Sequence, residues 1–525
     1  MIDHVALAPA YAAAGTALLA FLTDLIVGRR GAVLTVTALG AAATVAAALW
    51  VPGPRTSFCG AAGCSYVWDD FAAVVGVTVA VAAFVAVLLC APLLRAGVAP
   101  SGELCFLIGA AMTGGVVLGA SRDLITLIVA IETLTLPLYA AVALRRRELA
   151  SAQAAVTFFT VSVVSTAVTL LGAALLYAVT GTVHLNRLAA ALTGGDAGPT
   201  QEQLQAAARV RLLAEAGTTE VVAVPAQPAA SLPPGMAALA AAAVALVLVG
   251  LAFKVAAVPL HAWAPATYDG APLPVAAFLS TASKAGGVAA ILLVVVVGLG
   301  PQLAVAGPIL AALAVVTMTV GNLVALRQQR MVRLLAWSSI AQAGYILAPL
   351  GVFALADGRS PDALRGAVMA SLAYAVLFVL LELGAFAAVV ALRGAADGGD
   401  LDDYRGAARR RPFVAGAFVL AMAGLAGLPP GLAGLFAKVT VVRSLLEGAS
   451  GWLALVVALN AVVGAAYYVR ASLALFRSPE GADEAPWPRV AWPVAVALVL
   501  VTIGAVVVGF APQLVLSAVD LVIVG

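Results

Sequence analysis

The sequence predicts an all-α polytopic membrane protein with about fourteen transmembrane helices, and three observations support this fold class. Hydrophobic residues make up 63% of the 525 residues and charged residues only 10%, against about 25% charged residues in an ordinary soluble domain. The mean hydropathy is +1.09. The apolar runs are continuous and rich in Ala, Leu and Val, which is typical of helices and unlike the alternating strands of a membrane β-barrel.

Each transmembrane helix is predicted where about 20 mostly apolar residues can cross roughly 30 Å of hydrocarbon. The first run holds Asp24 and has no basic stretch before it, so we interpret it as a retained helix rather than a cleaved signal. The fourteen predicted spans are 5–27, 31–50, 71–92, 102–120, 123–144, 152–180, 236–258, 274–297, 302–326, 331–355, 363–392, 412–446, 451–476 and 490–518.

The one long stretch between spans covers residues 181–235. Its middle, 201–217, could form a short amphipathic helix, and its end, 224–235, is typical of an irregular linker. A stretch of this length could cover neighbouring helices or contact another subunit, but it is too small for a separate enzymatic domain.

Loop arginines set the expected orientation. One set of alternating loops holds 17 arginines and the other holds 8, so the positive-inside rule places the first set in the cytoplasm and both termini outside. Cys59 and Cys64 then lie on the outer side, where a disulfide across CGAAGC could form. Cys90 and Cys105 are typical of small apolar core residues.

The charge and the cysteines also exclude function classes. The net charge of +3 argues against nucleic-acid binding. Four cysteines without a CxxC pair exclude a disulfide scaffold and leave no cysteine motif for zinc or an iron–sulfur cluster. These observations leave the class of polytopic membrane proteins, which are surrounded by the lipid bilayer.

Lysine is found only inside apolar spans, as Lys254, Lys284 and Lys438. An ionised lysine at the centre of a membrane helix costs about 2.5–3.5 kcal/mol. A buried lysine can release its proton near neutral pH, whereas arginine stays protonated. This partition between lysine and arginine favours a proton relay; the alternative for Lys438, near the end of its span, is that it snorkels to the membrane interface.

Three acidic residues also lie in apolar spans. Glu132 is at mid-span and is the natural counter-charge for a lysine; the alternative is a protonated glutamic acid hydrogen-bonded to a neighbouring helix. Asp24, near the cytoplasmic end of its span, is equally consistent with an interfacial role and with a relay role. The sequence leaves the role of Glu382 open.

Prolines interrupt two spans beside lysines. Pro259 follows Lys254, and Pro429 and Pro430 precede Lys438. Proline removes a backbone donor and frees a carbonyl, which at membrane depth is tolerated only beside protein or water. Discontinuous helices in matching positions of two halves indicate a transport site. Two inverted five-helix repeats, spans 4–8 and 9–13, would make each broken helix the fourth helix of its repeat.

The predicted domains follow these repeats. They are an N-terminal three-helix segment (1–101), a first repeat with the long outer loop (102–297), a second repeat (298–476) and a C-terminal helix (477–525).

Several motifs resemble one family. The chain resembles the antiporter-like membrane subunits of proton-pumping NADH–quinone oxidoreductase, respiratory complex I, and among them subunit N. The Leu-Pro-Leu-Tyr form after Glu132 is typical of subunit N. The matching segments cover nearly the whole chain: ETLTLPLYAAVAL (132–144), FKVAAVPLHAWAPATYDGAP (253–272), STASKAGG (280–287), RLLAWSSIAQAGYIL (333–347), LDDYRGAARRRP (401–412) and GLPPGLAGLFAK (427–438).

The resemblance implies roles for matching residues. Glu132 and Lys254 would form the coupled pair of a first half-channel, Lys284 would lie on the central hydrophilic axis, and Lys438 would be the exit-side lysine of a second half-channel. Flavin, iron–sulfur clusters and quinone would be bound by other subunits, and this chain is expected to bind no cofactor or metal. Partners would be the antiporter-like and small membrane subunits of the complex in a bacterial-type cytoplasmic (inner) membrane.

The chain departs from the family pattern at three positions. Gln342 stands where many relatives have histidine, Glu382 where an amide is usual, and Leu435 where phenylalanine is common. Glu382 could supply the titratable group lost at Gln342, whereas Leu435 would change packing only. His261 is expected in a loop, where a structural hydrogen bond at the helix break is at least as good an interpretation as proton transfer.

Two other functions stay open from the sequence. A subunit of a multi-subunit cation/proton antiporter would share the fold, the glutamate–lysine pair and the broken helices. A passive membrane scaffold is the third reading, but buried lysines are a costly way to build one. The Leu-Pro-Leu-Tyr form and Lys438 favour the respiratory subunit, and the expected end of the chain soon after the fourteenth span favours N over the larger distal subunit L.

Overall fold

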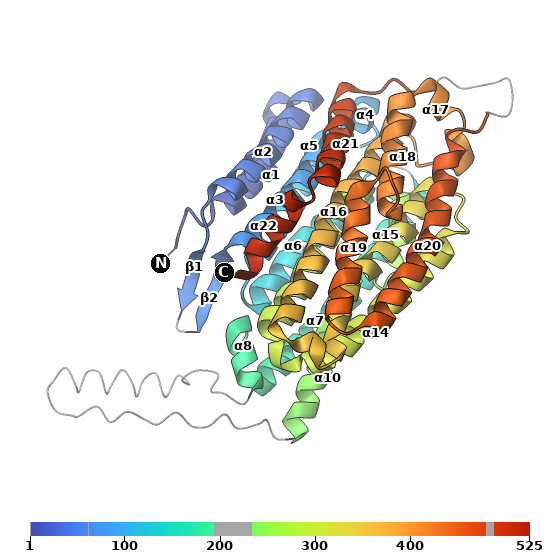
Figure 1. The fold of residues 1–525 in the computed structure, drawn as a ribbon. Helices are drawn as coiled ribbons and strands as arrows, with labels where there is room; N and C mark the ends of the chain where they lie inside the picture. The colour runs from blue at the N-terminus through green and yellow to red at the C-terminus, as the bar shows by residue number, and fades with distance from the viewer. Residues whose placement is uncertain (1, 61, 146–147, 194–233, 479–487, 525) are drawn as a thin grey trace, which may run out of the picture.

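A computed structural model describes residues 2–60, 62–145, 148–193, 234–478 and 488–524. Within these residues thirteen helices are long and apolar enough to cross a membrane. Two shorter helices, α18 (Pro412–Ala426) and α19 (Leu432–Glu447), together supply one further crossing. The helices run side by side as a bundle (Figure 1). The predicted all-α polytopic fold with about fourteen crossings is confirmed.

The first part of the chain holds a set of helices and a two-stranded hairpin. Asp69 and Asp123 start two of these helices, since their carboxylates accept hydrogen bonds from the amides of Ala72 and Thr126. The elements are α1 (Ala8–Val27), α2 (Arg30–Trp50), β1 (Arg55–Gly60), β2 (Gly63–Trp68), α3 (Asp70–Leu89), α4 (Ala91–Ala96), α5 (Ser101–Gly119), α6 (Leu124–Val142), α7 (Leu149–Thr180) and α8 (Leu185–Leu192).

The second part of the chain holds the core and both broken helices. Its elements are α10 (Pro234–Lys254), α11 (Trp263–Gly270), α12 (Leu273–Phe278), α13 (Lys284–Leu292), α14 (Leu303–Ala325), α15 (Met331–Leu347), α16 (Pro361–Arg393), α17 (Ala407–Arg410), α18, α19, α20 (Gly451–Ala474), α21 (Trp492–Phe510) and α22 (Gln513–Val524). Helices α12 and α13 belong to one run that continues through two π-helical stretches, 279–283 and 293–298. This run, α15 and α16 are the most buried crossings, whereas α1, α2, α7 and α21 face outward.

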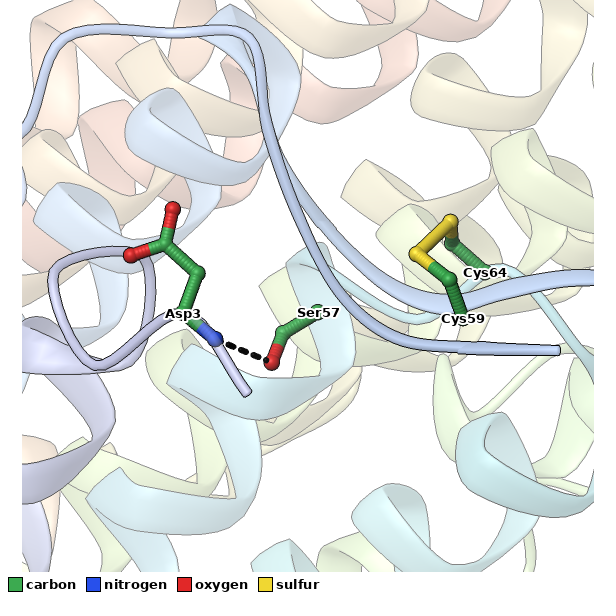
Figure 2. Close-up of a disulfide and its surroundings, with 4 residues drawn as sticks. All are labelled: Asp3, Ser57, Cys59 and Cys64. Carbon is green, nitrogen blue, oxygen red and sulfur yellow. Dashed lines mark hydrogen bonds between the residues drawn. A yellow bond between two sulfur atoms is a disulfide. The ribbon is translucent and has the colours of Figure 1, made fainter. Parts of the chain in front are cut away.

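One end of the bundle carries the hairpin, both termini and α8 (Figure 1). The strands pair antiparallel with Cys59 opposite Cys64, and these two cysteines form a disulfide (Figure 2). The amide of Asp3 donates to Ser57 Oγ at 3.1 Å, which ties the N-terminus to the hairpin (Figure 2). Backbone hydrogen bonds from Val67 and Arg122 join the hairpin to the α5–α6 linker.

The structure differs from the predicted spans in places where the backbone turns. The predicted last span, 490–518, is two helices, because α21 ends at Phe510 and α22 begins only after Pro512, which has no amide to continue the ladder. The predicted seventh span, 236–258, ends as a helix at Lys254. The amphipathic helix predicted at 201–217 and most of the linker at 224–235 lie outside the described residues.

Candidate functional site

Lys254 is the last residue of α10 and is buried, with 5% of its side chain exposed. Its Nζ donates hydrogen bonds to Glu132 Oε1 at 3.0 Å, Thr135 Oγ1 at 3.2 Å and Ser162 Oγ at 3.3 Å. An ammonium group has three donors and no acceptor, so this arrangement fits the protonated lysine. The structure thus brings the predicted pair Glu132 and Lys254 into direct contact between α6 and α10.

Glu132 lies on an exposed apolar stripe of α6. Thr166 donates a hydrogen bond to Glu132 Oε1 at 2.7 Å, and the glutamate side chain keeps 22% of its surface exposed. Ile125, Val129 and Leu136, spaced along the same side of α6, are 59%, 59% and 53% exposed. In this pair the Glu132 carboxylate is therefore accessible from the surface of α6, whereas the Lys254 ammonium is enclosed by the protein.

The break after Lys254 is stabilised by a neighbouring helix. The backbone turns at Ala256, whose φ is +56°, and the amide of Val258 donates to Thr317 Oγ1 of α14 at 3.0 Å. His261 Nδ1 lies 3.2 Å from the carbonyl oxygen of Pro259, and its ring lies against Trp337. The contacts of His261 are therefore with the break itself and an aromatic ring, as its structural interpretation expects.

Lys284 lies in the core and is 1% exposed. Its Nζ donates to the main-chain oxygen of Ser339 in α15 and lies 6.0 Å from the centre of the Phe378 ring. Gly286 and Gly287 follow in the same helix and let it pack closely against Lys254. A Cβ at Gly287 would lie 3.0 Å from Lys254 Cβ. Small residues permit such close helix packing in membranes.

Lys438 uses the end of a helix as its acceptor. Its Nζ donates to the carbonyl oxygens of Leu425 at 2.9 Å and Ala426 at 2.5 Å, at the C-terminus of α18. These carbonyls have no partner within their helix and carry the negative end of its dipole. The ammonium also lies 5.1 Å from the centre of the Tyr345 ring. The ammonium is therefore directed at the end of α18 inside the protein.

Pro429 and Pro430 lie in the turn between α18 and α19. Gly427 begins the turn with φ +78°, and a Cβ there would lie 2.7 Å from Lys438 Cδ. A Cβ at Gly434 would lie 1.7 Å from the oxygen of Gly424, so the two half-helices touch where only glycine fits. The prolines and glycines together place the lysine over the helix end.

A buried polar cluster lies beside Lys438. Gln342 Nε2 donates to the same Leu425 oxygen at 2.9 Å and to Tyr468 Oη at 2.7 Å. Tyr374 Oη donates to Gln342 Oε1 at 2.6 Å, and the hydroxyls of Tyr468 and Ser338 are 2.6 Å apart. Gln342, which does not titrate, therefore joins Tyr374 and Tyr468 to the carbonyl oxygen that Lys438 also contacts.

Glu382 is fully buried in α16. Within the described residues neither of its carboxylate oxygens has a hydrogen-bond partner. It lies within electrostatic range of Lys284, Tyr268 and Tyr468. It is thus a buried carboxyl group near Lys284.

The arginine-rich end of the bundle carries a polar cavity of about 860 Å³, lined in part by Asp269, Arg330 and Asp397. Arg330 Nε donates to Asp269 at 2.9 Å, and its NH2 group donates to Asp397 at 3.0 Å. Burial raises the pKa of Asp397, but hydrogen bonds from Arg330 and Arg393 lower it more, so that it lies below its usual value. These ion pairs tie the loop between α14 and α15 to α11 and to the loop that follows α16.

Sequence reasoning missed the neutral members of the site. Thr135 and Ser162 accept hydrogen bonds from Lys254, Tyr468 accepts one from Gln342, and the Ser338 hydroxyl bonds to that of Tyr468. Their signal in the sequence was the presence of polar residues inside otherwise apolar spans, such as the SSIAQAGY run. The direction in which such residues point depends on helix rotation, which one sequence does not show.

No group of three or more His, Cys, Asp and Glu suited to a metal occurs in the described part of the chain.

Comparisons with known proteins agree with each other. Residues 121–464 match the family described as NADH:quinone oxidoreductase/Mrp antiporter, transmembrane. The chain is 57% identical to NADH-quinone oxidoreductase subunit N of Salinispora tropica, over 98% of each protein. It is similar to a chain of respiratory complex I from Thermus thermophilus (29% identity, TM-score 0.73, 97% of this chain and 98% of that one). A chain of the Mrp complex from Dietzia sp. shares the fold at 20% identity (TM-score 0.77, 99% and 97% covered).

Proposed function

We propose, on the premise that this chain belongs to the NADH-quinone oxidoreductase subunit N family, that one glutamate and three lysines carry protons through it. The chain is a proton-translocating membrane subunit of that enzyme. The proposed relay residues are Glu132, Lys254, Lys284 and Lys438. The observation that carries the proposal is that each lysine is buried and bonded to oxygen from another helical segment.

The relay works by changing the charge next to each lysine. Glu132 and Lys254 form the first half-channel, Lys284 lies on the central axis, and Lys438 releases the proton in the second half-channel. Two unit charges about 4 Å apart interact by roughly 4 kcal/mol at an effective dielectric constant near 20, which is nearly three decades in a proton-binding constant. Loss of the glutamate charge would therefore be enough to drive the proton from Lys254.

The other membrane subunits of the complex are the partners. A carboxylate in the middle of an exposed apolar stripe is costly in hydrocarbon, and Glu132 lies between Val129 and Leu136 on such a stripe. We infer that a neighbouring membrane subunit, antiporter-like or small, covers this side of α6. A charge on that neighbour could then set the protonation of the first pair.

The chain acts in the enzyme without redox chemistry of its own. We propose that flavin, iron–sulfur clusters and quinone are bound by other subunits and that their reduction drives this relay. The chain is a multi-pass membrane protein, and we place it in a bacterial-type cytoplasmic (inner) membrane with both termini outside. The arginine count supports this orientation, and so does the Cys59–Cys64 disulfide at the end that carries the termini, since disulfides persist in oxidising compartments.

The two broken helices support the proposed repeat. We propose that residues 102–297 and 298–476 are inverted units, flanked by the segments 1–101 and 477–525. The break in the first unit lies after Lys254, and that in the second lies before Lys438. Each unit would then contribute one half-channel built at a helix break.

The proposed function is tested by purifying the tagged chain gently from its native membranes and measuring NADH:quinone reduction. Activity that co-purifies with flavin and iron–sulfur signals supports the respiratory subunit, and NADH-driven proton uptake in vesicles then tests the relay. A preparation without redox activity that contains other small membrane subunits would instead favour a cation/proton antiporter.

A further inference from the structure

Glu382 is a fully buried residue whose carboxylate forms no hydrogen bond within the described part of the chain. Its side chain is 0% exposed, and both of its oxygens lack a hydrogen-bond partner among the described residues. Burying an ionisable group without partners costs several kcal/mol. A membrane helix retains such a residue when it faces the protein interior and serves a pathway.

Unsatisfied oxygens from two further segments gather in the same place. Ser339 Oγ and the hydroxyl of Tyr268 are buried and without partners in the described part of the chain. Tyr268 lies near both Ser339 and Glu382, and Lys284 lies near Glu382 while donating to the Ser339 main-chain oxygen. Buried polar atoms that lack protein partners are usually satisfied by water, which makes about three hydrogen bonds. The cluster of Lys284, Tyr268, Ser339 and Glu382 therefore has the acceptors and donors that hold a buried water.

The other side of Glu382 leads toward Lys438. The carboxylate interacts with Tyr468, whose hydroxyl lies 2.7 Å from Gln342 Nε2. Gln342 and Lys438 then donate to one shared acceptor, the oxygen of Leu425, each at 2.9 Å. Hydrogen bonds thus run from Tyr468 through Gln342 and the Leu425 main-chain oxygen to Lys438, and the Glu382 carboxyl lies near the Tyr468 end of this chain of contacts.

The neutral groups of this connection cannot store a proton. A glutamine amide does not titrate in the physiological range, and a tyrosine hydroxyl has an ordinary pKa near 10. A carboxylate can accept a proton from an ammonium and release it again, which is the task of a group placed between two lysines. Gln342 is better suited to orienting the Tyr468 hydroxyl.

We propose that Glu382 is the proton-carrying residue between Lys284 and Lys438, assisted by water held at Ser339 and Tyr268. The inference rests on the proposed relay and deepens it. In the step, Lys284 loses one proton and becomes a neutral amine while the Glu382 carboxylate becomes a carboxylic acid. Glu382 then returns to the carboxylate as the proton passes by water and the Tyr468 hydroxyl to neutral Lys438.

The test uses the whole complex in sealed membrane vesicles with Glu382→Gln, which keeps the side-chain volume and removes the titratable group. We expect NADH-driven proton uptake to slow at least about tenfold, because loss of a positioned proton-transfer group commonly costs roughly 10²–10⁴-fold. Asp24→Asn is the matched control: Asp24 is also an acid in an apolar span, but it accepts a hydrogen bond from Ser101 at 2.7 Å and should leave proton uptake unchanged.

A rescue separates proton carrying from packing. The double variant Glu382→Gln with Gln342→His returns a titratable group to a position that contacts Tyr468 and the Leu425 carbonyl. We expect it to recover at least half of the lost rate, which a purely structural role of Glu382 does not predict. Wild-type proton uptake in an assembled Glu382→Gln complex would overturn the inference, and so would a loss of activity that the histidine does not repair.

A second readout does not need the glutamine variant to assemble. Infrared difference spectra of the wild-type complex during turnover should contain a carboxyl band that shifts in position in Glu382→Asp. A spectrum that is the same in both would overturn the role of Glu382. Failure of the underlying relay is recognised separately, because Lys254→Ala would then pump normally.

Discussion

The two broken helices hold their lysines by different means. Lys254 ends the first half of its helix and is paired with a carboxylate from α6 and two hydroxyls. Lys438 lies inside the second half of its helix and bonds to the carbonyl end of the first half. One ammonium is therefore stabilised by a side-chain charge that can be switched, and the other by main-chain dipoles that stay in place.

This difference between the two lysine sites suggests how proton transfer through a relay can have a direction. A site whose partner titrates can change its proton affinity when a neighbouring charge arrives, whereas a site built on carbonyls has a constant environment and responds mainly to its own proton. The first site suits coupling to other subunits, and the second suits release. The following predictions test this contrast, from the largest expected effect to the smallest.

Lys254→Ala should have the largest effect. It removes the proton carrier and leaves the half-buried Glu132 without its lysine partner, so proton uptake should fall by roughly 10² or more. If chemistry and transport are tightly coupled, quinone reduction should slow with it. Both rates are measured in the same vesicles, and wild-type pumping would remove Lys254 from the path.

Lys438→Arg should fail although it keeps a positive charge. Arginine can bond to the Leu425 and Ala426 carbonyls, but it does not release a proton at physiological pH. We expect proton uptake to fall at least about tenfold while assembly of the complex is retained. Full activity in this variant would mean that charge alone matters at the second break.

Glu132→Gln sharpens the comparison between the two sites. The amide keeps an oxygen for Lys254 and Thr166 but cannot carry the charge that holds the proton on Lys254. Proton uptake should fall by about tenfold, and its pH optimum should move to lower pH, because the lysine then loses its proton more readily. An unchanged pH profile would contradict the switching role of the pair.

Gly427→Ala is the corresponding change at the second break. It introduces a Cβ at a residue with φ +78° and places it 2.7 Å from Lys438 Cδ. A left-handed conformation costs a non-glycine residue about 1–2 kcal/mol, so we expect a lower unfolding temperature and a several-fold loss of proton uptake. The pH optimum should stay the same, in contrast to Glu132→Gln; thermal unfolding and a pH series measured on one preparation decide this.

Asp397→Asn should have the smallest effect. The pKa of Asp397 lies below its usual value of 3.8, so its ion pairs contribute stability above about pH 4, and this stability is lost as the pH falls through the folded-state pKa. The variant should lower the unfolding temperature slightly at neutral pH and reduce its fall in acid. Proton uptake should not change, and a large loss would place this loop in the relay.

Local features of the chain were predictable because they depend on neighbouring residues. An apolar run marks a crossing whatever surrounds it, and Pro429 and Pro430 interrupt a helix by removing amide donors. The spacing of Cys59 and Cys64 allowed either a disulfide or two free thiols, and the structure contains the disulfide. The unexpected division of the last span at Pro512 follows the same local rule and could have been predicted.

The sequence by itself determined the membrane fold, the placement of three lysines inside apolar helices and the two breaks beside them, because hydropathy and proline chemistry act over a few residues. Only the tertiary structure decided that Lys254 meets Ser162 and that Lys438 meets the end of α18. It also decided that Glu382 lies near Lys284, with no hydrogen-bond partner among the described residues. The physical reason is that contacts between distant helices depend on how each helix is rotated and how closely its small residues let it approach.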